Sequence, residues 1–338
     1  MPRPATSIDV AARAGVSQPT VSRALRNLPS ISPETKERVY RAARELNYVP
    51  REAGRSLATR RSRRVAIISE ALTNPYYPEL IEPLRRELAH LGYRAVLVAD
   101  SSDDVLTADA LSDGSYDGVL VTTAARDSRL AEDLRSRDVP HVFVNRTVDD
   151  PLSRNCGFSN GAHLLADLLV EQGHRRIALL TGPSQFSTAF EREQGLREAL
   201  REHGLRIPDR QVLRIDYTVS GGRNGALTLL TSSEPPTAIV CGNDVVAIGA
   251  LNAVRAMGWR APDDVSIVGF DDIPAAGWDI VSLTTVHCDL NALASVSVAA
   301  LHEAMEGEKS PLRHILEVSL VRRDSHGRPR EKLPPKPA

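Results

Sequence analysis

Short hydrophobic runs alternate with longer amphipathic stretches from residue 65 to about residue 270. Runs of this length are typical of buried strands, and the stretches of roughly 10–18 residues between them are typical of helices. Such an alternation predicts parallel sheets with helices on both faces, the doubly wound α/β arrangement. The predicted strands form two sets of four, which indicates two lobes: 65–69, 95–99, 118–122 and 141–145, then 176–181, 212–216, 237–241 and 265–270, with helices including 78–91, 160–172, 189–203 and 244–257.

The first 49 residues follow a different pattern, that of three short helices. Thr6 and Ser7 are residue types that cap helix N-termini, and Gly15 suits the end of a first helix because glycine tolerates a positive φ. Ser17 is placed to cap a second helix, and Ser32 a third. The apolar faces expected to pack together are Ile8, Ala11, Ala12 and Ala14, then Val21 and Leu25, then Val39, Ala42 and Leu46.

A tight turn at Gly15 and Val16 between the first two helices predicts a helix-turn-helix unit. In such a unit the second helix presents its amino-terminal residues to base edges in the major groove. Here those residues are the polar stretch from Gln18 to Arg23. The alternative reading of the residues alone is a three-helix cap whose arginines form a solvated face.

Charge is distributed unevenly along the chain, although the net charge is only −1. Residues 1–64 carry 14 Lys and Arg against five acidic residues, which leaves the remainder at about −10. A basic segment 1–64 followed by an acidic remainder indicates that only residues 1–64 bind a polyanion such as DNA.

Cysteine usage and hydropathy predict a cytoplasmic protein that does not bind a membrane. No apolar run approaches the ~20 residues needed to cross a bilayer, and the first residues lack the apolar segment of a secretory signal. Cys156, Cys241 and Cys288 lie far apart and form no CxxC pair, so neither disulfides nor a thiolate metal site is expected. Cys241 and Cys288 are expected to be small buried hydrophobes.

Polar and aromatic residues follow several of the predicted strands. Ligands of doubly wound sheets bind outside the carboxyl ends of the strands. Amide, carboxylate and guanidinium groups combined with aromatic rings suit a polyhydroxylated ligand. Some of these residues could instead cap a helix or loop, as Asn243, Asp244 and Asp272 would. The strand-end residues are Asn74, Tyr76, Tyr77, Thr122, Thr123, Asn145, Arg146, Tyr217, Asn243, Asp244, Asp271 and Asp272.

Three consecutive stretches, SIDVAARAGVSQPTVSRAL, SPETKERVYRAARELNYVP and REAGRSLATRRSRRVAI, closely resemble the LacI/GalR family of bacterial repressors. The likeness continues to about residue 323 through TNPYYPEL, YDGVLVTTA, EQGHRRIALLTGP, PTAIVCGNDVVAIGAL and DVSIVGFDDIP. The resemblance implies a helix-turn-helix domain followed by a periplasmic-binding-protein-like effector domain, whose two lobes are joined by three crossovers.

The resemblance implies DNA-contacting roles in the first unit. Gln18, Pro19 and Arg23 occupy base-reading positions, and Arg23 is suited to bidentate contact with guanine. Pro19 departs from the polar residue of many relatives, so the base read there is not predicted. Residues 51–58 match a hinge helix that folds on operator DNA in relatives, with Leu57 as a minor-groove wedge; without the resemblance this segment would be a flexible basic linker. The residues expected to contact DNA are Thr6, Ser7, Ser17, Gln18, Pro19, Thr20, Ser22, Arg23, Asn27, Arg55 and Leu57.

The resemblance likewise implies an effector site between the lobes, in which Arg192 matches a ligand-clamping arginine. Ala71 stands where many relatives carry aspartate and Phe190 where many carry arginine, so the effector cannot be copied from a relative. Trp278 could line the mouth of the cleft, or it could pack in a core or an interface. The residues expected to contact the effector are Tyr77, Thr122, Arg146, Arg192, Tyr217, Asn243 and Asp271.

These observations together predict a sequence-specific transcriptional regulator, a repressor that binds a near-palindromic operator as a homodimer. Its operator affinity would change when a sugar or related metabolite binds between the lobes. A solute-binding protein of a transporter would share the lobes but has no use for residues 1–64. An enzyme is disfavoured because the sequence contains no GxGxxG, Walker A, HExxH or GxSxG motif, so no cofactor, metal or catalysis is predicted.

The predicted domain limits follow from the same patterns. The helix-turn-helix domain covers 1–49, the hinge and linker 50–64, and the effector-binding and dimerisation domain 65–323. The polar, proline-rich segment 324–338 is expected to be a disordered tail, and it lacks the apolar heptads of a tetramerising coiled coil. Lobe 1 is expected at about 65–158 plus 288–315, and lobe 2 at about 159–287 plus 316–323.

Overall fold

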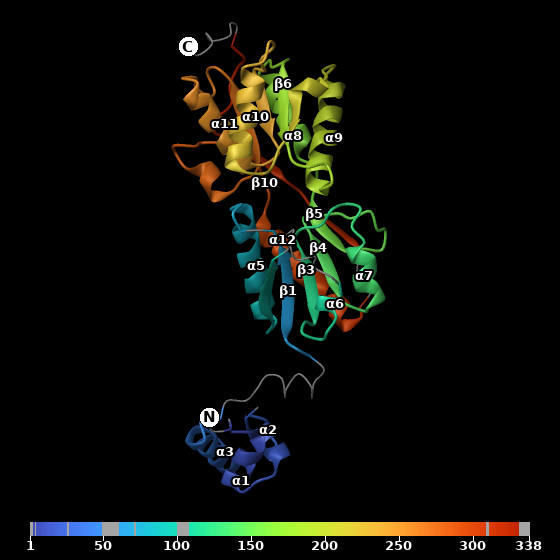
Figure 1. The fold of residues 1–338 in the computed structure, drawn as a ribbon, viewed down its shortest axis with the longest axis vertical. Coiled ribbons are helices and arrows are strands. Elements are labelled where there is room, and N and C mark those ends of the chain that lie inside the picture. The colour runs from blue at the N-terminus through green and yellow to red at the C-terminus, as the bar shows by residue number, and fades with distance from the viewer. Residues whose placement is uncertain are drawn as a thin grey trace. The chain divides into compact units, whose positions relative to one another are not determined.

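The computed structural model describes residues 3, 5–25, 27–48, 61–70, 72–99, 108–308 and 311–330. The chain divides into two compact units, Met1–Ser62 and Arg63–Ala338 (Figure 1). None of the helices in the described ranges is long and apolar enough to span a bilayer.

Three helices form the amino-terminal unit: α1 (Ser7–Ala14), α2 (Gln18–Leu25) and α3 (Pro33–Glu45). The backbone of Thr6 donates to the Asp9 carboxylate over 2.8 Å, and the Thr6 hydroxyl accepts from the Asp9 amide, so the two residues cap α1 reciprocally. Helix α1 ends at Gly15, whose φ of 65° is a left-handed conformation that glycine adopts without strain. The core of this unit consists of Val10, Ala11, Ala14, Val21, Ala24, Val39, Ala42 and Ala43.

The predicted inward face of α1 was wrong at two positions. Ile8 is 68% exposed and Ala12 is exposed, whereas Val10 is fully buried. Helix α1 begins at Ser7, so Val10, Ala11 and Ala14 share the face that meets α2 and α3.

The first lobe of the second unit is built on a six-stranded sheet in the order β11-β5-β4-β3-β1-β2, with parallel pairing throughout. Alternate residues of β1 point to opposite faces: Val65 and Ile67 pack with α5 and α12, and Ala66 and Ile68 with α6 and α7. The elements are β1 (Arg64–Ser69), α5 (Tyr76–His90), β2 (Arg94–Ala99), α6 (Ala108–Leu111), β3 (Gly118–Val121), α7 (Leu130–Ser136), β4 (His141–Val144), β5 (Asn155–Phe158), α12 (Leu290–Glu306) and β11 (Arg313–Leu316).

The second lobe repeats this arrangement in the order β12-β10-β9-β8-β6-β7, where only β12 pairs antiparallel. Helices α10 and α11 cover one face of its sheet, and α8 and α9 cover the other. The elements are α8 (Ala162–Glu171), β6 (Ile177–Thr181), α9 (Ser187–Glu202), η1 (Asp209–Gln211), β7 (Val212–Arg214), α10 (Val219–Leu230), β8 (Ala238–Cys241), α11 (Asp244–Ala256), β9 (Ser266–Asp271), η2 (Pro274–Gly277), β10 (Thr284–His287) and β12 (Ser319–Val321).

The predicted doubly wound α/β class is confirmed, but each sheet has six strands rather than four. The missed strands β5, β10, β11 and β12 are three or four residues long and mix polar with apolar residues. The chain crosses between the lobes after β5, β10 and β11, as the resemblance implied. Leu316, expected in lobe 2, ends β11 and therefore belongs to lobe 1.

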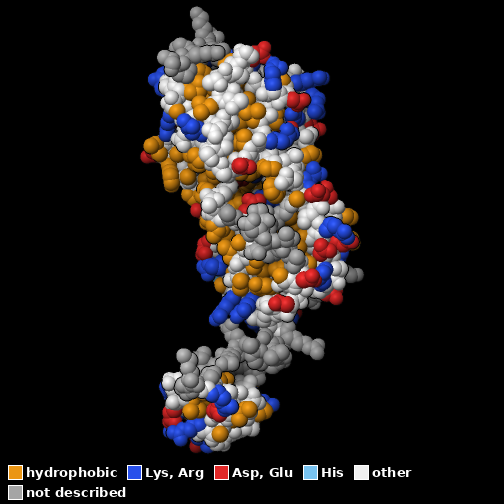
Figure 2. Space-filling model, viewed as in Figure 1, with side chains coloured by type: hydrophobic (Ala, Val, Ile, Leu, Met, Phe, Trp, Pro, Cys, Tyr) orange, Lys and Arg blue, Asp and Glu red, His pale blue; other side chains and the backbone are white. Residues whose placement is uncertain are grey.

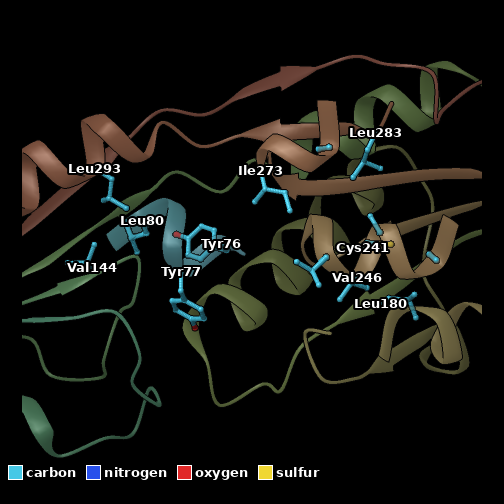
Figure 3. Packing of buried hydrophobic residues seen from close by; sticks show 14 of the residues in the cluster. Tyr76, Tyr77, Leu80, Val144, Leu180, Cys241, Val246, Ile273, Leu283 and Leu293 are labelled. Carbon is cyan, nitrogen blue, oxygen red and sulfur yellow. The ribbon is translucent and has the colours of Figure 1, made fainter. Parts of the chain in front are cut away.

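A continuous hydrophobic cluster joins the two lobes. Tyr76, Leu80 and Val144 of the first lobe and Ile273 and Leu180 of the second all belong to it (Figure 3). Cys156, Cys241 and Cys288 are free and buried, which confirms the prediction that Cys241 and Cys288 are small buried hydrophobes.

The segment expected to be a disordered tail packs onto the second lobe over its described part, residues 324–330. Ser325 is 3% exposed and donates to the carbonyl of Ile267 over 2.6 Å. The carbonyl of Gly327 accepts from Nε2 of the buried His174 over 2.9 Å, and Arg330 pairs with Asp264. The disorder prediction was therefore wrong for these residues, because buried polar groups of the lobe bind this backbone; residues 331–338 lie outside the described ranges.

Candidate functional site

Helix α2 of the amino-terminal unit buries Val21 and Ala24 and leaves its polar residues accessible. Gln18, Pro19 and Arg23 are exposed, and Thr20 and Ser22 are half-buried between them and the core. A recognition helix needs this geometry to enter the major groove, because its polar face must reach the bases while its apolar face packs on the other two helices.

The residues flanking α2 fix its amino-terminal end. The Ser17 hydroxyl lies 2.9 Å from the Thr20 hydroxyl and accepts from the Thr20 amide over 3.4 Å. Gln18 Nε2 donates to the Ser7 hydroxyl over 3.3 Å, which joins the start of α2 to the start of α1. Asn27 adopts a φ of 54° after α2, and its carbonyl accepts from Lys36 Nζ over 3.3 Å.

The structure therefore gathers most of the residues predicted to contact DNA on one three-helix unit. The predicted hinge residues Arg55 and Leu57 lie outside the described residues. Those that the structure describes are Thr6, Ser7, Ser17, Gln18, Pro19, Thr20, Ser22, Arg23 and Asn27.

A polar cavity lies between the two lobes of the second unit. Its walls come from the carboxyl ends of strands in both sheets and from the amino-terminal parts of α5 and α9, where ligands of doubly wound sheets bind. Six of the seven predicted effector residues line it: Tyr77, Arg146, Arg192, Tyr217, Asn243 and Asp271. The remaining lining residues are Asn74, Tyr76, Asn145 and Thr188.

Arg192 and Asp271 form a buried ion pair in the cavity wall. Arg192 Nη2 donates to Asp271 Oδ1 over 2.8 Å, and Nη1 donates to the carbonyl of Gly242 over 2.5 Å. Their side chains are only 12% and 6% exposed. Burial raises the pKa of the Asp271 carboxyl, and Arg192 opposes that shift.

Arg146 is the second buried guanidinium of the cavity. Its Nη2 donates to the Tyr77 hydroxyl over 3.1 Å, and its Nη1 donates to the carbonyl of Asn145 over 2.8 Å and to Thr188 Oγ1 over 3.3 Å. Burial raises the pKa of Tyr77 to about 12, so this phenol is neutral at physiological pH and does not neutralise Arg146.

Two cavity residues hold unusual backbone conformations at strand ends. Asn145 has a φ of 54° and Asp271 a φ of 104°, and neither is a glycine. Residues of this kind cost about 1–3 kcal/mol each and persist where the surrounding structure holds them, often in ligand sites. Asn145 Nδ2 donates to the Tyr76 hydroxyl over 2.5 Å, so its side chain orients an aromatic ring of the cavity.

Tyr217 approaches the backbone of the second lobe so closely that only glycine fits beneath it. A Cβ at Gly182 would lie 2.7 Å from Tyr217 Cζ, and one at Gly242 would lie 2.7 Å from its hydroxyl. The hydroxyl is buried, and among the described residues it makes no hydrogen bond of normal geometry.

The remaining strand-end residues act mainly within the protein. Asn243 lines the cavity but also caps α11, because its Oδ1 accepts from the Val246 amide over 2.9 Å. Asp244 accepts from the Thr285 hydroxyl, and Asp272 pairs with Arg323 over 2.7 Å. Thr122, predicted to contact the effector, donates to the carbonyl of Ile68 over 2.8 Å and is not among the lining residues.

The edge of the cavity carries direct contacts between the lobes. The amide of Thr147 donates to the Ser187 hydroxyl over 2.9 Å, and the Arg126 amide donates to the Gln185 carbonyl over 2.7 Å. The Arg126 guanidinium lies 4.0 Å from the ring centroid of Phe190. Phe190 thus serves the contact between lobes rather than the cavity wall.

A second cavity adjoins the first on the side of the crossovers. It shares Asn145, Arg146, Thr188 and Arg192 with the first cavity, so the two arginines separate the two spaces. Its own wall includes the crossover residues Phe158 and Cys288.

Thr188 is the cavity residue that sequence reasoning missed outright. It precedes Arg192 by four residues on α9, so the two side chains share one helix face. This four-residue spacing from Arg192 could have identified Thr188 from the sequence. Trp278, whose role was left open, is 60% exposed and is not part of the cavity wall.

Comparisons with known proteins match both units. A family model described as bacterial regulatory proteins of the lacI family matches residues 8–51, and one described as a periplasmic binding protein-like domain matches residues 166–326. The chain is 32% identical to the transcriptional regulator CelR of Thermobifida fusca, covering 94% of this chain and 96% of that protein. It is 30% identical to the probable repressor ExuR of Bacillus subtilis (strain 168), covering 91% and 94% of the two chains.

Solved structures give the same result. The lac repressor dimer bound to operator and the anti-inducer ONPF matches with a TM-score of 0.85 and 28% identity, covering 96% of this chain and 99% of that one. The complex of CelR with cellobiose matches with a TM-score of 0.73 and 31% identity, covering 95% and 99%.

Proposed function

The chain belongs to the LacI family of bacterial regulatory proteins and is a DNA-binding transcriptional regulator, and we propose that a small molecule bound in the interlobe cavity controls its affinity for operator DNA. The observation that carries this proposal is the pairing, in one chain, of an accessible recognition helix α2 with a polar cavity whose walls come from both lobes. We propose repression as the outcome, since the relatives ExuR and CytR are named repressors.

The operator is proposed to be near-palindromic and to be bound by a homodimer. Two recognition helices in successive major grooves require half-sites about 34 Å apart, which a two-fold dimer supplies. Large apolar side chains on the surface of the second unit support dimerisation: Trp278 is 60%, Ile280 68% and Leu97, on the edge strand β2, 44% exposed. Figure 2 shows hydrophobic side chains gathered on one flank of the second lobe.

We propose that the effector acts through contacts between the lobes. A ligand that binds Arg146 and Arg192 engages side chains from both lobes at once, so it favours one closure state. The closure state would set the spacing of the two segments 51–58 in the dimer, and with it the fit to the minor groove. Coupling of this kind amounts to ~1–3 kcal/mol in operator affinity.

The cavity is proposed to bind without catalysing a reaction, because Asp271 is committed to Arg192 and Arg146 cannot accept a proton at physiological pH. The location is proposed to be cytoplasmic, where operator DNA is found. The effector is proposed to be a sugar or related metabolite, since hydroxyl groups suit the amides, carboxylate and aromatic rings of the wall.

Selection from genomic DNA tests the regulator function. The full-length protein is mixed with sheared genomic DNA from its own source, bound fragments are recovered, and each is measured by gel shift at increasing salt. The expected result is enrichment of fragments that share one near-palindrome, with affinity that falls steeply as salt rises. Recovery of fragments without a common near-palindrome contradicts the proposal.

A further inference from the structure

Arg146 is a buried cation without a carboxylate partner. It is only 8% exposed, and no acidic group of the described residues lies within ion-pair distance of it. Its three described hydrogen bonds go to neutral oxygens of Tyr77, Asn145 and Thr188. Its Nε is buried and has no hydrogen-bond partner at all among the described residues.

A guanidinium cannot escape this situation by losing its proton. Arginine stays charged at any physiological pH, and a buried charge is costly unless it is paired. The charge of Arg192, in contrast, is balanced by an ion pair, because its Nη2 lies 2.8 Å from Asp271 Oδ1. Of the two arginines in this cavity, only Arg146 therefore has a positive charge that an anionic ligand could still neutralise.

The acidic side chains nearest to Arg146 do not form an ion pair with it. Glu70 accepts from the Thr123 hydroxyl over 3.1 Å and also hydrogen-bonds Tyr77, so it acts on Arg146 at longer range and not as a direct ion-pair partner. Glu191 lines only the second cavity, and burial raises its pKa. The charged side chains in the wall of the first cavity are therefore Arg146, Arg192 and Asp271, which leaves one positive charge in excess.

We propose that the effector carries an anionic group, a carboxylate or a phosphate, that binds Arg146. This inference rests on the proposed function, because it takes the interlobe cavity as the effector site. Arg146 lines both cavities, so the anionic end of the ligand lies at the boundary between the two spaces. A fork of guanidinium nitrogens, including the unpaired Nε, matches the oxygens of either group.

A panel of matched sugars tests the charge of the ligand. Glucose, galactose and mannose are compared with their uronates and 6-phosphates, and with inorganic phosphate, at equal ionic strength by thermal shift and calorimetry on the full-length protein. At least one uronate or 6-phosphate should bind about tenfold or more tightly than its neutral parent. The uronate and 6-phosphate arms separate carboxylate from phosphate recognition. Equal binding of neutral and anionic partners, or no binding by any anion, overturns the proposal.

Variants of Arg146 assign the preference to this side chain. Arg146→Gln should reduce the preference for the anion by about tenfold or more, and Arg146→Lys should retain part of it, because lysine keeps the charge but loses the fork. Arg201→Gln is the matched control, since Arg201 is an exposed arginine near the end of α9 that lines neither cavity. An unchanged preference in Arg146→Gln overturns the proposal.

Operator binding, measured on the same protein preparations, distinguishes a failure of the anion assignment from a failure of the regulator function. If the variants bind operator as the parent protein does, they are folded, and loss of anion preference then reports on Arg146 alone. If the parent protein binds operator but no anion, the anion assignment fails and the regulator function stands. If it binds no operator, the regulator function itself fails.

Discussion

Arg146 Nη1 donates a hydrogen bond to Thr188 Oγ1 over 3.3 Å and so joins the first lobe to the second through the wall of the cavity. The neighbouring Thr147 amide reaches Ser187 in the same way, over 2.9 Å. Both contacts meet the amino-terminal turn of α9, the helix that also carries Arg192. A ligand that binds Arg146 or Arg192 therefore contacts either a residue bonded to this turn or a residue of the same helix.

Removal of the Arg23 side chain should weaken operator binding selectively. Arg23 is exposed on α2, and loss of a bidentate contact with guanine costs ~1–3 kcal/mol of discrimination. We expect Arg23→Ala to lower affinity for the operator about 5–150-fold and to lower affinity for a scrambled duplex much less, as measured by fluorescence anisotropy. Arg41→Ala removes the same charge from α3, and it should affect the two duplexes equally; an equal effect of Arg23→Ala would refute base reading by this residue.

Substitution of Leu57 tests the hinge, which lies outside the described residues. A side chain that wedges into a base step contributes only where the duplex can be kinked. Leu57→Ala should therefore weaken specific binding far more than non-specific binding in the same anisotropy measurement. Parallel losses on operator and scrambled DNA would show that the segment is an ordinary basic linker.

Neutralisation of Asp271 should destabilise the second unit. The substitution Asp271→Asn leaves the Arg192 guanidinium buried without its charge partner, which costs ~3 kcal/mol in the free energy of unfolding. Chemical denaturation of the full-length protein measures this loss. Glu132→Gln breaks an exposed ion pair with Arg129 and should cost less than ~1 kcal/mol. Similar stability of the two variants would contradict the structural role of the Arg192–Asp271 pair.

Stability should fall as the pH is lowered, in part because of His174. This ring is fully buried, and burial lowers its pKa from the usual 6.5. The folded state therefore favours the neutral ring, so its contribution to stability is complete above pH 6.5 and is lost as the pH falls below that value. Melting temperatures measured from pH ~7.5 to ~5 should decline. His174→Gln should lower the melting temperature at neutral pH but flatten the decline; an unchanged slope would exclude His174 as a source.

Much of the cavity was predictable because its residues stand at strand ends. The positions of Arg146, Asn243 and Asp271 follow from the alternation of strands and helices together with the binding rule for parallel sheets, and Tyr77 lies at the start of the helix that follows β1. Arg192 was assigned through the resemblance, since it lies on a helix and not at a strand end.

Features that depend on long-range packing were not predictable. The role of His174 is set by Thr237, Ser266 and Gly327, which lie 63 to 153 residues away in the chain. The order of residues 324–330 follows from the same contacts, although their composition is typical of a mobile tail. Thr122 is not among the lining residues, and its hydroxyl bonds the neighbouring strand, a contact that the strand pattern alone does not reveal.

Operator affinity measured with and without a ligand of the cavity decides whether this protein is an effector-controlled regulator. A compound that stabilises the parent protein in a thermal-shift screen is added to the anisotropy assay with the selected operator, for the parent and for Arg192→Met. The parent should change its operator affinity about 5–150-fold when the compound is present, while Arg192→Met should bind operator but no longer respond to the compound. A compound that occupies the cavity of the parent and leaves its operator affinity unchanged would contradict the account.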